Sequence, residues 1–161
     1  MIRWLTRLFS SPEPAVEAAR PRDARKLSQL HAASFHRGWS ETEFEQLLAE
    51  RNTLTHRLRA GNETIGFIIS RLAADEAEIL SVAIDGAWRG RGLSRQLLQT
   101  HLGHLAGHGI RTVFLEVEEN NLPAVKLYQR YGFQVVGRRE QYYREPSGQL
   151  LSALVMQRDL S

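Results

Sequence analysis

Hydrophobic and polar positions repeat with two different periods along this chain. Residues 53–59 alternate in polarity, and residues 65–69 and 77–84 are short runs rich in strand-forming side chains, so we predict three strands joined by tight turns. Between residues 93 and 106 the leucines recur every three or four positions, which indicates an amphipathic helix. The chain therefore changes from paired strands to alternating helices and strands near residue 85.

The remaining elements are predicted from residues that favour helix starts and from apolar runs. Ser40 and Glu43 have the spacing of a capping box that opens a helix, and Pro123 suits the first turn of another helix. The run 113–117 is almost continuously apolar, as in a strand that is covered on both faces. This order predicts an α+β domain whose mixed sheet is covered by helices. The other segments are helices over 22–36, 40–50 and 121–131 and strands over 112–117, 133–144 and 150–158.

Length and composition limit the possible classes of protein. The 161 residues leave room for one domain, which we place at 21–161, after an N-terminal extension at 1–20. Residues 1–11 suit either a short amphipathic helix or a loosely packed segment. The chain has no cysteine, which fits a cytoplasmic protein and excludes disulfide scaffolds and thiolate sites. No apolar run reaches the roughly 20 residues that span a bilayer, so we expect no transmembrane segment.

The net charge of +3 does not indicate a nucleic-acid partner. The basic excess lies within residues 1–30, and the charges of the rest of the chain are balanced. A nucleic-acid-binding domain would instead carry a positive stripe on its folded surface. We therefore expect no direct binding of nucleic acid.

Two glycines, Gly90 and Gly92, stand directly before the leucine-rich helix. Backbone N–H groups at a helix N-terminus bind phosphate groups well, and Arg89, Arg91 and Arg95 add positive charge here. The alternative is a plain chain reversal with solvated arginines. The segment matches neither the phosphate-binding loop of nucleotide hydrolases nor the glycine pattern of dinucleotide-binding domains, which weakens both nucleotide hypotheses.

Several titratable residues of the second half are candidates for chemistry. Glu116 interrupts an apolar strand, where a carboxylate is costly unless it has a partner or faces a cleft; the alternative is an exposed strand end. Tyr128 lies on the next helix, and its spacing alone suits a core position better than a catalytic one. His101, His104 and His108 share one helix without an acidic residue or cysteine, so we expect exposed histidines and no metal.

Together these segments resemble the GCN5-related N-acetyltransferases (GNAT). Arg89-x-x-Gly92-x-Ser94 is similar to the signature of that superfamily, whose turn holds the pyrophosphate of acetyl-CoA. The run LEVEENNLPAVKLYQRYGF (115–133) resembles the next strand and helix, most of all in the ribosomal-protein alanine N-acetyltransferases. FHRGWS (35–40) and QYY (141–143) resemble acceptor-side motifs of those enzymes. The resemblance covers residues 20–159 and implies a mostly antiparallel sheet with splayed central strands at 82–84 and 113–117.

The resemblance also implies a reaction and a set of site residues. The reaction would be acetyl transfer from acetyl-CoA, without a metal, to the N-terminal α-amine of a protein, a ribosomal protein being one candidate. Glu116 would be the general base and Tyr128 the general acid. Trp39, Tyr142 and Tyr143 would shape the peptide entrance. The expected acetyl-CoA contacts are Val82, Ala83, Ile84, Arg89, Gly90, Arg91, Gly92, Leu93, Ser94, Arg95 and Asn121.

Three departures from the family pattern lie at or near these motifs. Ser94 replaces a glycine or alanine, and its small side chain fits a helix start. Residues 36–38 precede Trp39 where the relatives have a shorter apolar-proline step, and Leu151-Ser152 stands where they usually carry Glu-Asp. The last two departures concern the acceptor. A small-molecule amine acceptor and a non-catalytic acetyl-CoA-binding module therefore stay open as alternatives, as does the choice between monomer and dimer.

Overall fold

The described residues form one seven-stranded sheet with the strand order β1-β2-β3-β4-β5-β7-β6. The computed structural model describes residues 13–144 and 147–160, with the side chains of residues 141–144 excepted. Neighbouring strands run antiparallel, apart from the parallel pair of β4 and β5. The strands are β1 (Ala15–Ala18), β2 (Thr53–Ala60), β3 (Glu63–Ala73), β4 (Glu76–Ile84), β5 (Thr112–Glu118), β6 (Gln134–Arg144) and β7 (Leu150–Asp159).

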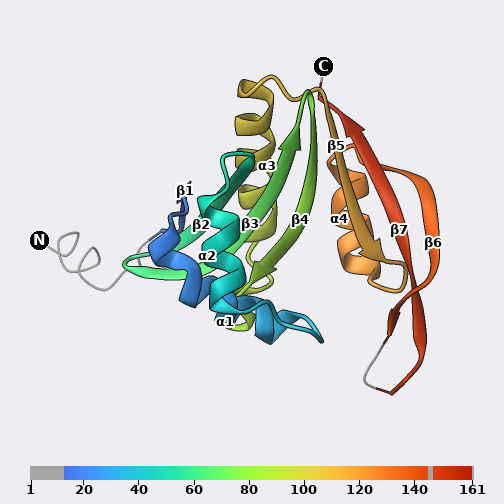
Figure 1. Cartoon of the computed structure of the whole chain (residues 1–161), viewed down its shortest axis with the longest axis horizontal. Coiled ribbons are helices and arrows are strands. Elements are labelled where there is room, and N and C mark those ends of the chain that lie inside the picture. Colours follow the sequence, from blue (N-terminus) through green and yellow to red (C-terminus); the bar gives the residue numbers. More distant parts are fainter. Residues whose placement is uncertain (1–12, 145–146, 161) are drawn as a thin grey trace, which may run out of the picture.

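Helices cover both faces of the sheet (Figure 1). Helices α1 and α2 pack on one face around a core that includes Phe44 and Phe67. Helices α3 and α4 pack on the other face around a larger core that includes Leu97 and Leu115. The predicted α+β fold with a mixed, mostly antiparallel sheet is therefore confirmed. The helices are α1 (Ala24–Ser34), α2 (Glu41–Ala49), α3 (Leu93–Gly107) and α4 (Leu122–Arg130), with short 3₁₀ turns at Pro21–Asp23 and Gly86–Trp88.

The helix ends follow the local chemistry of the sequence. The Ser40 hydroxyl accepts a hydrogen bond from the Glu43 N–H at 3.1 Å, and the Glu43 carboxylate accepts one from the Ser40 N–H at 2.8 Å. This is the predicted capping box. Gly132, just after α4, has a φ of +84°, a conformation that glycine adopts without strain. No helix of the described segments is both long and apolar enough to cross a membrane.

Strand β1 lies inside the stretch that the sequence analysis assigned to an extension. It pairs antiparallel with β2, from Ala15 opposite Arg59 to Ala18 opposite His56. Four residues of mixed polarity carry too little periodicity to predict a strand. The sheet therefore begins before residue 21. The predicted helix or loose segment at 1–11 lies outside the described residues.

Candidate active site

The sheet opens between its parallel strands β4 and β5. These strands pair from Glu76 with Thr112 as far as Ile79 with Leu115, and no later pair joins them in the described chain. Beyond that point they diverge, with α4 along β5 and α3 behind β3 on the other side of the gap (Figure 1). Separation thus begins after residues 79 and 115, so the first part of the predicted splayed segment 113–117 is still paired. The C-terminal halves of both strands expose unpaired backbone edges to the gap.

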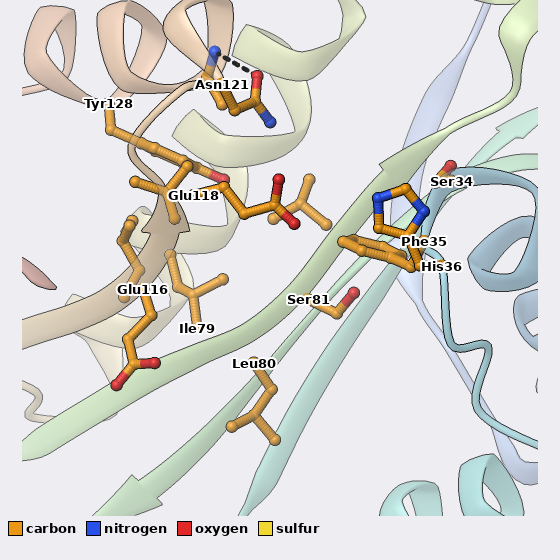
Figure 2. Close-up of a pocket in the computed structure, with 14 residues that line it drawn as sticks. Ser34, Phe35, His36, Ile79, Leu80, Ser81, Glu116, Glu118, Asn121 and Tyr128 are labelled. Carbon is orange, nitrogen blue, oxygen red and sulfur yellow. Dashed lines mark hydrogen bonds between the residues drawn. The ribbon is translucent and has the colours of Figure 1, made fainter. Parts of the chain in front are cut away.

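A cleft of about 270 Å³ lies in this gap. Its walls come from four parts of the chain: the end of α1, the middle and end of β4, the end of β5, and α4 with its N-cap (Figure 2). A wider cavity of about 810 Å³ adjoins it on the α1–α2 side and shares Phe35, Leu80, Glu116 and Glu118 with it. The two cavities therefore form one continuous path through the splayed sheet.

Glu116 lines both cavities, as its position in an apolar strand suggested. Burial alternates along β5, so Glu116 shares a sheet face with Phe114 and Glu118, opposite the buried Leu115 and Val117. Its side chain is 18% exposed, and its Oε1 lies 3.0 Å from the Nε of Arg139 on β6. The carboxylate is therefore ion-paired at the edge of the cleft, and the exposed strand end is not observed.

Tyr128 lines the narrower cavity from α4. Its ring meets Phe133 edge-on, with the ring centroids 5.7 Å apart. Burial raises the pKa of the Tyr128 phenol to about 12, because the phenolate would lose its hydration. Tyr128 is thus both a partly buried packing residue and a protonated phenol at the cleft.

The glycine-rich loop lies beside a separate cavity of about 440 Å³ at the start of α3. Gly90 and Gly92 have φ values of +78° and +73°, which other residues adopt only with strain. A Cβ at either position would project into open space, so backbone conformation rather than packing requires glycine there. Leu93, Ser94 and Arg95 continue this wall in the first turn of α3. These residues fit a diphosphate, since backbone donors at a helix start stand beside open space.

Two arginines of the loop have partners within the protein. The Nε of Arg89 donates to the carbonyl of Ile84 at 3.3 Å, and its Nη2 donates to the Ser34 hydroxyl at 3.4 Å. The guanidinium of Arg91 lies over the Trp88 ring, 4.6 Å from the centroid. Arg89 therefore ties the loop to β4 and to the end of α1.

The other residues predicted to contact the cofactor flank the same gap. Val82, Ala83 and Ile84 pair with β3 on one side, while the side of these residues that faces β5 has no ladder partner in the described chain. Asn121 caps α4, because its side-chain oxygen accepts a hydrogen bond from the Ala124 N–H at 3.4 Å. The structure thus brings the strand edge, the loop and the start of α4 to one side of the splay.

Trp39 lines the wider cavity and is held by His31. Its backbone N–H donates to the His31 Nδ1 at 3.0 Å, and its backbone carbonyl accepts from the Ser28 hydroxyl at 2.7 Å. The rings of His31 and Trp39 stack with their centroids 4.4 Å apart. Burial lowers the pKa of His31 to about 4, so its Nδ1 remains an acceptor at neutral pH. The side chains of Tyr142 and Tyr143 lie outside the described residues, although their backbone belongs to β6.

The histidines of α3 differ from the prediction. His101 is fully buried, with its Nδ1 2.7 Å from the Nδ1 of His56 and its Nε2 2.7 Å from the Ser70 hydroxyl. The expectation that these histidines are exposed is therefore wrong for His101, because the inner face of α3 packs on β2 and β3. His104 and His108 are exposed. No group of three or more possible metal ligands occurs among the residues that the structure describes.

Glu118 in the cleft and Arg139 beside it were not singled out from the sequence. Glu118 follows Glu116 by two positions, so strand alternation alone was a sufficient signal that both face the cleft. Arg139 gave no such signal. It reaches Glu116 across β7, which lies between β5 and β6, and this neighbourhood exists only in the folded sheet.

The sequence matches known acetyltransferases. Residues 24–133 match the acetyltransferase (GNAT) family. The [ribosomal protein bS18]-alanine N-acetyltransferase of Haemophilus influenzae is 34% identical over 141 residues, which cover 81% of this chain and 95% of that protein. The N-alpha-acetyltransferase RimI of Mycobacterium tuberculosis is 35% identical over 159 residues, which cover 94% of this chain and 97% of that protein.

The fold matches solved structures of the same kind. The ribosomal-protein-S18-alanine N-acetyltransferase from Escherichia coli has a TM-score of 0.87 at 26% identity, covering 92% of this chain and 95% of that one. Arabidopsis thaliana NAA60 in complex with acetyl-CoA shares the fold, with a TM-score of 0.80 at 20% identity and coverage of 92% and 99%. Because its sequence and its fold both match, the chain belongs to the acetyltransferase (GNAT) family of acetyl-CoA-dependent N-acetyltransferases.

Proposed function

We propose that this protein transfers the acetyl group of acetyl-CoA to the N-terminal α-amine of a protein, with a ribosomal protein as the acceptor. The observation that carries the proposal is the likeness, over 81% and 94% of this chain, to two enzymes named for acetylating α-amines or the alanine of a ribosomal protein. Residues 21–161, with β1 added, form the proposed catalytic domain. A ribosomal acceptor would place the reaction in the cytoplasm.

The glycine-rich loop and the edge of β4 are the proposed holders of acetyl-CoA. Backbone N–H groups around residues 90–95 would receive the pyrophosphate, supported by the charge of the nearby arginines. The free edge at residues 82–84 would pair with the pantetheine amides, and Asn121 would contact the cofactor at the start of α4. Bound in this way, acetyl-CoA supplies the acetyl thioester and a thiolate leaving group at the gap between the strands.

Glu116 is the proposed general base and takes the ammonium proton through an intervening water. The identity of the amine matters for such a base, because carboxylates are weak bases. An N-terminal amine has a pKa of about 7.7–8.0, against about 10.4 for lysine, so roughly a tenth of it is already neutral at pH 7. This difference of about 3–4 kcal/mol supports an α-amine acceptor over a lysine.

Tyr128 is the proposed general acid at the leaving sulfur. Its pKa of about 12 keeps the phenol protonated at neutral pH, so the O–H is available as a donor. A free thiol has a pKa of about 8.5, which makes complete proton transfer from this phenol to a thiolate unfavourable. A hydrogen bond to the developing thiolate is therefore the main stabilisation that Tyr128 provides.

The acceptor would enter through the wider cavity. Trp39, held by His31, and the strand that carries Tyr142 and Tyr143 are the proposed walls of this entrance. Residues 36–38, which depart from the family pattern, contribute His36 and Arg37 to the same cavity. We therefore assign to this segment the choice between acceptors.

A thiol-release assay tests the proposed function. The protein is mixed with acetyl-CoA and short peptides that begin with Ala, Ser, Met or Gly, and mass spectrometry locates the added acetyl group. We expect turnover with at least one peptide and acetylation at the α-amine only. Rapid acetylation of a polyamine or an aminoglycoside without peptide turnover would contradict the proposal and favour a small-molecule acceptor.

A further inference from the structure

Glu118 is a second carboxylate of the cleft, distinct in its surroundings from Glu116. It is half-buried at the end of β5 and lines both the narrower and the wider cavity. Its backbone is fixed, because it pairs with Ala153 of β7 and its carbonyl accepts a hydrogen bond from the Asn121 N–H at 3.0 Å. The backbone that carries this side chain is thus held in place at the end of β5.

The two carboxylates point in different directions. Figure 2 shows the Glu118 carboxylate extending into the gap on the Tyr128 side, towards Phe35 and His36 across the cleft, while that of Glu116 is directed away from Tyr128. Glu116 already engages one oxygen with Arg139 at 3.0 Å. The Glu118 carboxylate has no ion pair or hydrogen bond with any residue that the structure describes. It is therefore the carboxylate of β5 whose oxygens are free to receive a ligand.

A free carboxylate at the junction of the two cavities selects for a cation. The acceptor must bring its amine through the wider cavity to the thioester side, and at neutral pH about nine-tenths of an α-amine is an ammonium group. An ammonium group donates up to three hydrogen bonds, and charge-assisted bonds to a carboxylate are stronger than neutral ones.

We propose that Glu118 binds the ammonium group of the acceptor directly and thereby positions the nitrogen for deprotonation and attack. The inference rests on the proposed function, in which Glu116 receives the proton through a water. Glu118 forms no covalent bond and transfers no proton. It acts on binding, so its loss should raise the KM for the acceptor and leave the affinity for CoA unchanged.

The test compares two ligands that differ only in the terminal group, which is an ammonium in one and a neutral hydroxyl in the other. On CoA-loaded protein no transfer occurs, so calorimetry gives the Kd of a peptide that begins with alanine and of its lactyl counterpart, in which a hydroxyl replaces the amine. At pH 6.5 we expect the wild type to prefer the amine by roughly 10- to 100-fold, the range for a hydrogen bond between charged groups. Glu118→Gln should reduce this preference to about one.

Glu78→Gln is the matched control, since Glu78 is exposed and lines only the wider cavity. It removes the same charge and should keep the preference for the amine. An unchanged preference in Glu118→Gln, or an equal loss in both variants, would overturn the inference. Tm and the Kd for CoA report whether the variant is folded, and Glu118→Asp should restore part of the preference.

Failure of the proposed function is recognised separately. If no peptide binds the wild type, the α-amine proposal is wrong, and the same comparison is made with a diamine and the matching amino alcohol. A loss of the diamine preference in Glu118→Gln alone would then still support the role of Glu118. A preference for the diamine that is retained in Glu118→Gln would refute that role.

Discussion

Acidification from pH 7 to pH 5 is expected to destabilise this protein because three buried histidines are kept neutral. Burial lowers the pKa of His31 and His56 to about 4 and that of His101 to about 3. His56 and His101 share a hydrogen bond between their Nδ1 atoms, which requires that one of the two nitrogens be unprotonated. In the unfolded chain the same residues titrate near their ordinary pKa of about 6.5.

The sign of the effect follows from proton binding. A histidine whose folded pKa lies below its unfolded pKa binds more protons when unfolded, so stability is lost as the pH falls below about 6.5. Each of the three histidines should cost about 2 kcal/mol between pH 7 and pH 5, or about 5–6 kcal/mol together. That loss is comparable to the whole stability of a small domain, about 5–15 kcal/mol.

Urea unfolding at pH 7, 6 and 5, followed by circular dichroism, measures this loss. The range from pH 7 to pH 5 reports on the histidines and not on Glu17. The hydrogen bond to Arg57 lowers the pKa of the Glu17 carboxyl, so its contribution to stability is lost only below about pH 4.5. His56→Gln should reduce the loss by about 2 kcal/mol, whatever its effect at pH 7. His36→Gln, at an exposed position after α1, is the control and should leave the loss unchanged. Equal stability of the wild type at pH 7 and pH 5 would refute the reasoning.

Three further changes test the site. Tyr128→Phe should lower kcat by roughly 100-fold with an unchanged Kd for acetyl-CoA, and an equal loss in both would contradict the acid role. Gly92→Ala should cost about 1 kcal/mol in urea unfolding, because its φ of +73° strains any other residue, and should weaken CoA binding in calorimetry; an unchanged Kd would remove the loop from the proposed site. Arg139→Gln should change stability by less than about 1 kcal/mol, since Arg139 is 54% exposed, yet lower kcat several-fold; unchanged kcat would show that Glu116 needs no partner.

Local signals in the sequence were sufficient for most elements of the fold. The capping box of Ser40 and Glu43, the leucine spacing of α3 and the apolar run of β5 each depend on residues a few positions apart. Such signals act through backbone hydrogen bonds and side-chain periodicity, which the chain carries whatever its tertiary fold. β1 was missed because it is a strand through its pairing with β2, whose residues lie about forty positions later in the chain.

The residues of the site were identified by motif, but their surroundings were not. That Glu116 meets Arg139 follows from the order of β5, β7 and β6, and that His31 holds Trp39 follows from the turn after α1. Glu118 was within reach of strand alternation, but its lack of a partner was not. Whether a carboxylate is paired or free depends on which distant strands become neighbours.

The sequence by itself determined which segments become helices and strands, apart from β1, and, by resemblance, the family and the residues of its motifs. Only the tertiary structure decided which side chains of those segments meet: His101 with His56 and Ser70, and Glu116 with Arg139. The physical reason is that a local pattern fixes which face of an element is buried, whereas the register and order of the sheet fix what that face is buried against.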